Sequence, residues 1–173
     1  MNRSASPVLI CLSGLPFSGK TFLCTALKES LKATIVSYDD LWVKQSEENG
    51  SWQSWEQVTK IAHQHISKFL LPQSVVLFDN LGDTRAYRRT LQGLAKEKEA
   101  IFVILYLDTP ASIRVKRWTE NQETKHRHSV SKTRVSQKTQ FEPPNRTEAD
   151  LFVRVLPTTT LTDIYELVVT HIY

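Results

Sequence analysis

Three features are scarce in this chain of 173 residues: cysteine, Gly/Ser-rich stretches and long apolar runs. The only cysteines, Cys11 and Cys24, lack a Cys-x-x-Cys spacing, so we expect two reduced, buried thiols rather than a disulfide or a metal site. The apolar run 8–12 is too short for a signal sequence or a membrane span. These absences favour a cytoplasmic protein in which residues 1–173 form one domain.

The charge balance is mildly basic. Lysine and arginine total 22 against 18 aspartate and glutamate, which gives a formal net charge of +4. This excess suits an anionic ligand, but it is too small to indicate nucleic acid by itself.

Short apolar segments alternate with stretches of helical periodicity. The segments predicted as strands are 8–12, 34–37, 74–79, 101–107 and 151–155. Helices are expected between and after them, including one whose core-facing residues recur at helical spacing, namely Trp55, Val58, Ala62, Ile66 and Phe69. Strands separated by helices predict an α/β fold with a parallel sheet covered by helices on both faces.

The clearest chemical signal is the segment 14–21, Gly-Leu-Pro-Phe-Ser-Gly-Lys-Thr, which fits the P-loop pattern G-x-x-x-x-G-K-[ST]. The segment follows a predicted strand and opens a predicted helix, as that motif requires. Backbone N–H groups would surround the β-phosphate of ATP, Lys20 would reach the β- and γ-phosphates, and Thr21 would ligate Mg²⁺. The residues expected at the nucleotide are Gly14, Pro16, Phe17, Ser18, Gly19, Lys20, Thr21 and Phe22.

Acidic side chains follow two predicted strands, at the edge where open α/β sheets bind ligands. Asp39 and Asp40 are expected in the loop after the second strand, where one carboxylate could serve as the base for an attacking hydroxyl and Asp40 could equally cap the next helix. Asp79 ends the third strand and is expected to reach Mg²⁺ through water. It also begins the Asp-x-x-Gly pattern of GTPases, but the sequence contains no Asn-Lys-x-Asp, so guanine recognition is not expected.

A basic stretch from 114 to 138 is rich in lysine and arginine. We interpret it as a lid that closes over the nucleotide, with Arg114 at the nucleotide and Arg117 neutralising charge on the transferred phosphoryl group. A solvated surface segment is the alternative interpretation.

Four segments carry a resemblance to a known family: 14–21, Ser-Tyr-Asp-Asp at 37–40, Val-Val-Leu-Phe-Asp-Asn at 75–80 with Arg85 and Arg89 following, and Phe-Glu-Pro-Pro at 141–144 with Glu-Ala-Asp at 148–150. Together they resemble the AAA_33-type P-loop kinases, which include phage polynucleotide kinase and relatives of zeta-toxin and chloramphenicol phosphotransferase. The resemblance implies a nucleotide-kinase-like three-layer sandwich with strand order 2-3-1-4-5, ATP as donor and Asp39 as general base.

The resemblance also has a departure on the acceptor side. Polynucleotide kinases of this kind carry an arginine three residues after the base, where this chain has Trp42. Trp42 could instead stack a base or another ring. The residues expected to contact the acceptor are therefore Asp40, Trp42, Arg85 and Arg89.

Two functions follow as hypotheses. The first is an ATP-dependent phosphotransferase that uses Lys20, Asp39 and Arg117 to move the γ-phosphoryl group to a hydroxyl of a small molecule or nucleic acid. The alternative is an ATP-binding and ATP-hydrolysing switch, or an RNA-associated factor, without an acceptor of its own.

Overall fold

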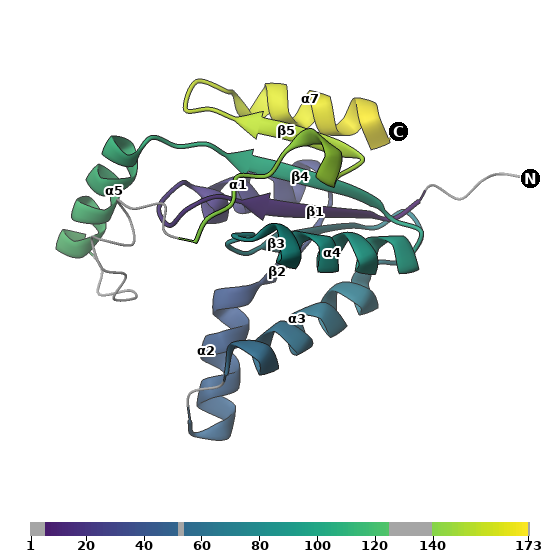
Figure 1. Cartoon of the computed structure of the whole chain (residues 1–173), viewed down its shortest axis with the longest axis horizontal. Coiled ribbons are helices and arrows are strands. Elements are labelled where there is room, and N and C mark those ends of the chain that lie inside the picture. Colours follow the sequence, from purple (N-terminus) through teal and green to yellow (C-terminus); the bar gives the residue numbers. More distant parts are fainter. Residues whose placement is uncertain (1–5, 52–53, 125–139, 173) are drawn as a thin grey trace, which may run out of the picture.

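The computed structural model describes residues 6–51, 54–124 and 140–172. Strands and helices alternate along the chain (Figure 1), as the sequence predicts. The elements are β1 (Val8–Ser13), α1 (Lys20–Ser30), β2 (Thr34–Ser37), α2 (Tyr38–Asn49), α3 (Trp55–Phe69), β3 (Val75–Asp79), α4 (Arg85–Glu97), β4 (Ile101–Leu107), α5 (Ala111–Thr124), the 3₁₀ turn η1 (Arg146–Glu148), β5 (Leu151–Val155) and α7 (Leu161–Ile172).

The five strands form one sheet in the order β2-β3-β1-β4-β5, with every neighbouring pair parallel. This order confirms the predicted nucleotide-kinase-like topology. Because all strands are parallel, their carboxyl ends meet at one edge, where the segments after β1, β2, β3 and β4 leave the sheet. α5 lies beyond that edge, at the opposite end of the molecule from the N-terminus (Figure 1).

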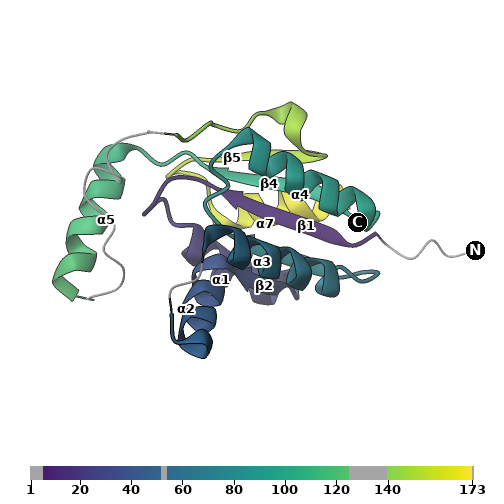
Figure 2. The same cartoon turned by 60° about the horizontal axis from the view of Figure 1, so that its bottom comes forward.

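Each face of the sheet buries its own apolar core, which makes three layers. Alternate residues of β1 divide between the two cores: Val8, Ile10 and Leu12 pack against α1 and α7, whereas Leu9 and Cys11 face α3 and α4. In Figure 2, α3 and α4 lie in front of the sheet and α7 behind it. A strand that is buried on both faces is apolar throughout, which is why 8–12 is a continuous apolar run.

The sequence prediction missed α2. Asp39 and Asp40 lie in the first turn of this helix rather than in a loop, and the side chain of Ser37, not that of Asp40, accepts the capping hydrogen bond from the Asp40 N–H. Only Tyr38 and Leu41 of α2 are buried, so the helix has almost no apolar stripe that a periodicity search could detect. Carboxylates in a first turn are favourable because that end of the helix carries partial positive charge.

Trp55 also departs from its predicted place in the core. It begins α3, and 43% of its surface is exposed, while Val58, Ala62 and Ile66 are fully buried as expected. Ser54 and Gln57 form a capping box at this end of α3, so the helix starts at Trp55 for reasons independent of its burial.

Part of the predicted lid lies outside the residues that the structure describes. Residues 114–124 belong to α5, whereas 125–138 fall within an undescribed range. Within the described residues, no helix combines the length and the apolar character needed to cross a bilayer.

Candidate nucleotide site

The segment 14–21 forms the turn between β1 and α1 at the carboxyl edge of the sheet. Gly14 and Gly19 adopt φ angles of 155° and 106°, which L side chains rarely adopt. A Cβ on Gly14 would also lie 2.8 Å from Ser18 Oγ and 2.9 Å from the Leu107 carbonyl oxygen. Both glycines are therefore required by the backbone itself, as the P-loop motif predicts.

The end of α1 that faces this turn has free hydrogen-bonding capacity. Gly19 is the N-cap residue and provides no side-chain cap, so the first N–H groups of α1 lack that partner. Ser18 Oγ is buried and has no hydrogen-bond partner among the described residues. A phosphate group would satisfy these donors, so the turn fits the ligand that its sequence indicates.

The side chain of Lys20 folds back over the turn. Its Nζ donates to the carbonyl oxygens of Gly14 at 2.8 Å and Leu15 at 3.2 Å. Burial lowers its pKa from 10.5 to about 8, while Asp79 and Asp39 act in the opposite direction. A buried ammonium held only by carbonyl oxygens is poorly compensated, and an anionic ligand would supply the missing charge.

Thr21, Asp79 and Lys20 converge beside the turn. Burial raises the pKa of Asp79, while a hydrogen bond with the Thr21 side chain and the charge of Lys20 lower it. Thr21 and Asp79 thus bring a hydroxyl and a carboxylate together, which are oxygen donors of the kind that Mg²⁺ takes alongside phosphate oxygens and water. No group of three or more His, Cys, Asp or Glu side chains in the described parts of the chain could hold a metal by itself.

Asp39 and Asp40 lie exposed on α2, near this group. Both carboxylates raise the pKa of Asp79, and Asp39 also acts on Lys20. The acids after β2 and β3 and the lysine of the turn therefore share one electrostatic environment at the carboxyl edge of the sheet.

Arg117 of α5 contacts the turn directly. Its Nη1 donates to the carbonyl oxygens of Ser18 at 2.8 Å and Phe17 at 3.1 Å. Arg114 lies one turn earlier, is 1% exposed, and donates from Nε to the Thr109 carbonyl oxygen, while the Thr109 hydroxyl donates to the Ser18 carbonyl oxygen. The two arginines face the same side of α5 as predicted, but Arg114 is buried and supports the helix start.

The loop after β3 is fastened to the start of the P-loop. The Gly14 N–H donates to the Leu81 carbonyl oxygen, and Ser13 Oγ donates to that of Gly82. The Gly82 N–H itself donates to Asn80 Oδ1 at 2.7 Å. In the Asp-x-x-Gly pattern this N–H is already bonded, so 79–82 is a fixed loop in this structure rather than an open switch.

A buried ion pair behind this loop escaped the sequence analysis. Arg88 is 1% exposed, donates from Nη1 to the Gly82 carbonyl oxygen, and pairs with both carboxylate oxygens of Glu148. The sequence reasoning selected Arg85 and Arg89 instead, which are exposed on α4. Helical spacing could have identified Arg88, because it lies three residues before the buried Leu91 and seven before the buried Ala95.

The remaining predicted contact residues occupy varied positions. Phe22 is 71% exposed on the first turn of α1, and Trp42 is half-buried beside Tyr38 on α2. The Arg85 N–H, at the start of α4, donates to Glu142 Oε2. Phe141 is buried and stacks on Tyr106, so the Phe-Glu-Pro-Pro segment is anchored both to α4 and to the sheet.

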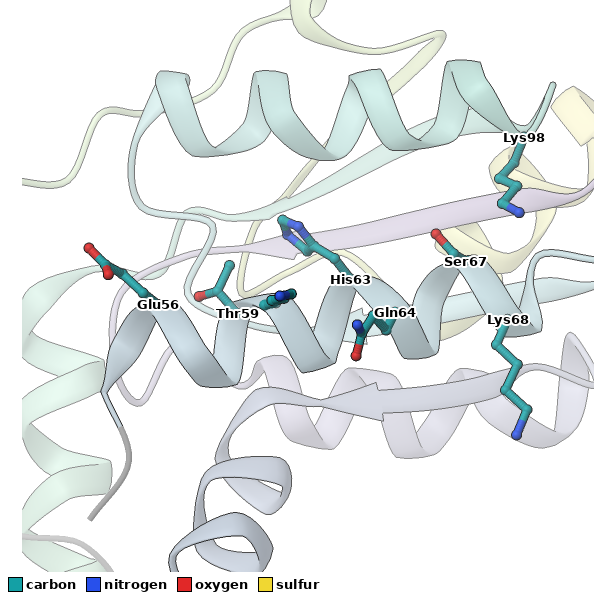
Figure 3. A pocket seen from close by; sticks show the side chains of 8 residues that line it. Glu56, Thr59, His63, Gln64, Ser67, Lys68 and Lys98 are labelled. Atoms are coloured by element: carbon teal, nitrogen blue, oxygen red, sulfur yellow. The ribbon is translucent and has the colours of Figure 1, made fainter.

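A groove of about 750 Å³ runs along α3, on the side that faces α4, and includes none of the predicted site residues (Figure 3). His63 projects from α3 toward α4 and stacks on Tyr87, and Lys98 closes the far end. Burial lowers the pKa of His63. The groove and the nucleotide turn are thus separate features of the molecule.

The family comparison covers almost all of these elements. Residues 8–171 match the model of the family described as chromatin associated protein KTI12. The chain belongs to the KTI12 family. The match supports a P-loop kinase-like family, but not specifically the polynucleotide kinase type of the AAA_33 group. No curated protein sequence matches the chain significantly.

Solved structures share the fold at low sequence identity. A candidate kinase from Chloroflexus aurantiacus is 16% identical with a TM-score of 0.79, over 98% of this chain and 97% of that chain. A gluconokinase from Sinorhizobium meliloti is 19% identical with a TM-score of 0.64, over 97% and 93%. Kti12 of Chaetomium thermophilum, in complex with ADP-AlF3, is 19% identical with a TM-score of 0.67, over 95% and 99%. These likenesses show a common P-loop kinase-like fold, which is shared by proteins of different function.

Proposed function

We propose that this KTI12-family chain binds ATP with Mg²⁺ at the turn 14–21 and transfers the γ-phosphoryl group to a hydroxyl. The convergence of Lys20, Thr21, Asp79 and Asp39 at one edge of the sheet is the observation that carries the proposal. The complex of Chaetomium thermophilum Kti12 with ADP-AlF3 supports the choice of nucleotide.

On the nucleotide side, the chain supplies positive charge and N–H donors. The backbone of Gly14 to Thr21 would surround the phosphates, and Lys20 would exchange its carbonyl partners for phosphate oxygens. Thr21, with Asp79 acting through water, would hold Mg²⁺. Bound there, the metal neutralises charge that develops on the phosphate oxygens.

On the acceptor side, Asp39 would accept the proton of the attacking hydroxyl. Its carboxylate is exposed, begins α2 and lies within electrostatic reach of Lys20. Asp40, Trp42, Arg85 and Arg89 are the proposed acceptor contacts. Arg117 needs only to leave the carbonyl oxygens of Phe17 and Ser18 to meet negative charge at the turn, which fits it to neutralise the transferred group.

A second candidate follows from the family match. The family is described as chromatin associated, which favours a chain that binds and hydrolyses ATP in response to a partner rather than one that modifies a diffusible alcohol. In that case Asp39 would orient water, and the cytoplasmic location expected from the sequence would not hold.

The test is transfer from γ-labelled ATP to a panel of 5′-OH DNA, RNA, tRNA, nucleosides and aminoglycosides, with phosphate release measured in parallel. We expect Asp39→Asn to lower transfer by about 10²- to 10⁴-fold while ATP affinity is retained. Lys20→Ala should abolish ATP binding.

Asp40→Asn is the matched control, since it removes a neighbouring exposed carboxylate from the same turn. It should change KM more than kcat. Full transfer activity in the Asp39 variant would show that another group is the base, whereas ATP hydrolysis that appears only with RNA or a protein partner, with no labelled acceptor, would support the second candidate.

A further inference from the structure

Three aromatic side chains gather where α2 meets α3. The rings of Tyr38 and Trp55 lie 4.2 Å apart between centroids with an interplanar angle of 34°, and Trp42 meets both edge-on, at 6.0 Å from Tyr38 and 6.5 Å from Trp55. We call Tyr38, Trp42 and Trp55 the aromatic cluster. It joins the first turn of α2 to the first turn of α3.

Trp55 is the outermost member and is held firmly from within. Tyr38 is buried against it, and the Tyr38 hydroxyl donates to the Trp55 carbonyl oxygen at 3.2 Å. The capping box of Ser54 and Gln57 fixes the backbone of the same turn. The indole is therefore backed by a second ring while 43% of the residue surface stays open.

The aromatic cluster adjoins the proposed base. Tyr38 directly precedes Asp39, and Trp42 follows Asp39 by three residues, which places Asp39 and Trp42 on one side of α2. Burial raises the pKa of Tyr38 to about 12, and the charge of Asp39 contributes in the same direction. Asp39 also acts on Lys20, so one carboxylate lies within electrostatic reach of both the cluster and the nucleotide turn.

We propose that Trp55, backed by Tyr38, is a stacking surface for a planar ring on the acceptor, so that the acceptor is a nucleoside-like alcohol rather than an open-chain polyol. This inference rests on the proposed function, because Asp39 defines the acceptor side. A rigid, flat and partly open indole gains most from another flat ring, since stacking covers the whole face at little cost in conformational freedom. An open-chain polyol has no flat face and would leave the indole uncovered.

Cytidine and ribose are suitable probes because they share a sugar and differ by one planar base. With the nucleotide turn filled by ADP and Mg²⁺, titration calorimetry should give at least about 5-fold tighter binding of cytidine than of ribose, since base stacking typically changes affinity by about 5- to 150-fold. The indole N–H signal of Trp55 should shift with cytidine only. Trp55→Leu should remove the preference, and Trp55→Phe should keep part of it.

Leu167→Ala is the matched control, because Leu167 is a large exposed apolar residue on α7. It should keep the cytidine preference, and unfolding in urea checks that each variant folds. Equal binding of cytidine and ribose to the unchanged chain, or a preference that survives in Trp55→Leu, would overturn the stacking surface. The assay needs no phosphoryl transfer, so a chain that prefers cytidine through Trp55 but labels no acceptor would overturn the kinase proposal alone.

Discussion

Arg88 and Glu148 form a buried, two-pronged ion pair that joins α4 to the 3₁₀ turn before β5, with Nε to Oε2 at 2.8 Å and Nη2 to Oε1 at 3.2 Å. The third arm of Arg88 holds the Gly82 carbonyl oxygen, which also accepts the Ser13 hydroxyl. One guanidinium thus links the loop after Asp79 to the strand that leads into the nucleotide turn. Such a pair is sensitive to the loss of either partner, because the other charge then stays buried alone.

Arg88→Met should therefore destabilise the fold by about 3–5 kcal/mol, which leaves Glu148 buried without its cation. The double variant Arg88→Met/Glu148→Leu should lose much less than the sum of the single changes, since it removes both buried charges. Urea unfolding of the four proteins measures this coupling. Strictly additive losses would show that the two side chains do not act as a pair.

Gly82→Ala should destabilise the chain more than Gly50→Ala. Both glycines have positive φ, 55° and 63°, so an alanine at either meets similar backbone strain of about 1–2 kcal/mol. Only at Gly82 would the new Cβ press on backbone, 3.0 Å from the Leu12 carbonyl oxygen, whereas Gly50 has open space. Thermal unfolding of the two variants compares the contact directly, and equal shifts would contradict the close packing of this loop.

The order of the sheet and the nucleotide turn could be predicted because their signals are local and unambiguous. Strands buried on both faces are continuous apolar runs, and a turn with two strained glycines before a lysine has few alternatives. Resemblance then supplied the strand order, which parallel pairing confirms.

The missed features depend on contacts between distant segments. α2 buries only two residues, so nothing in its own sequence distinguishes it from a polar loop. The role of Arg88 depends on Glu148, 60 residues away, and an arginine between two exposed arginines looks like a surface residue. Trp55 shares the helical spacing of the core, but its place at the first position of α3 leaves it partly outside.

ATP affinity should fall as the pH rises above about 8. In the free chain burial depresses the pKa of Lys20 from 10.5 to about 8, so the ammonium loses its proton above that pH, while bound phosphates favour the charged form. Binding at pH 9 should take up close to one proton, and affinity should drop by up to about tenfold per pH unit. Calorimetry in buffers of different ionisation enthalpy measures the uptake.

Lys20→Met is the control for that pH dependence. It should bind ATP weakly and with no proton uptake between pH 8 and 10, since the titrating group is absent. The same depressed pKa makes the folded chain bind fewer protons than the unfolded chain between about 8 and 10.5, so the free energy of unfolding should rise with pH across this window. A proton uptake that persisted in the methionine variant would assign the titration to another group.

Arg117→Ala should impair phosphoryl transfer or ATP hydrolysis by about 10²- to 10³-fold with little change in stability. The side chain is largely exposed and its contacts are to the carbonyl oxygens of Phe17 and Ser18, so its removal leaves no buried charge behind. Lys116→Ala is the matched control on the same helix, because Lys116 makes only an exposed pair with Glu120 at 4.0 Å. Steady-state rates with both variants separate a specific role of Arg117 from a general effect of positive charge on α5. Equal rates for the two variants would mean that Arg117 only holds the empty turn and takes no part in the reaction.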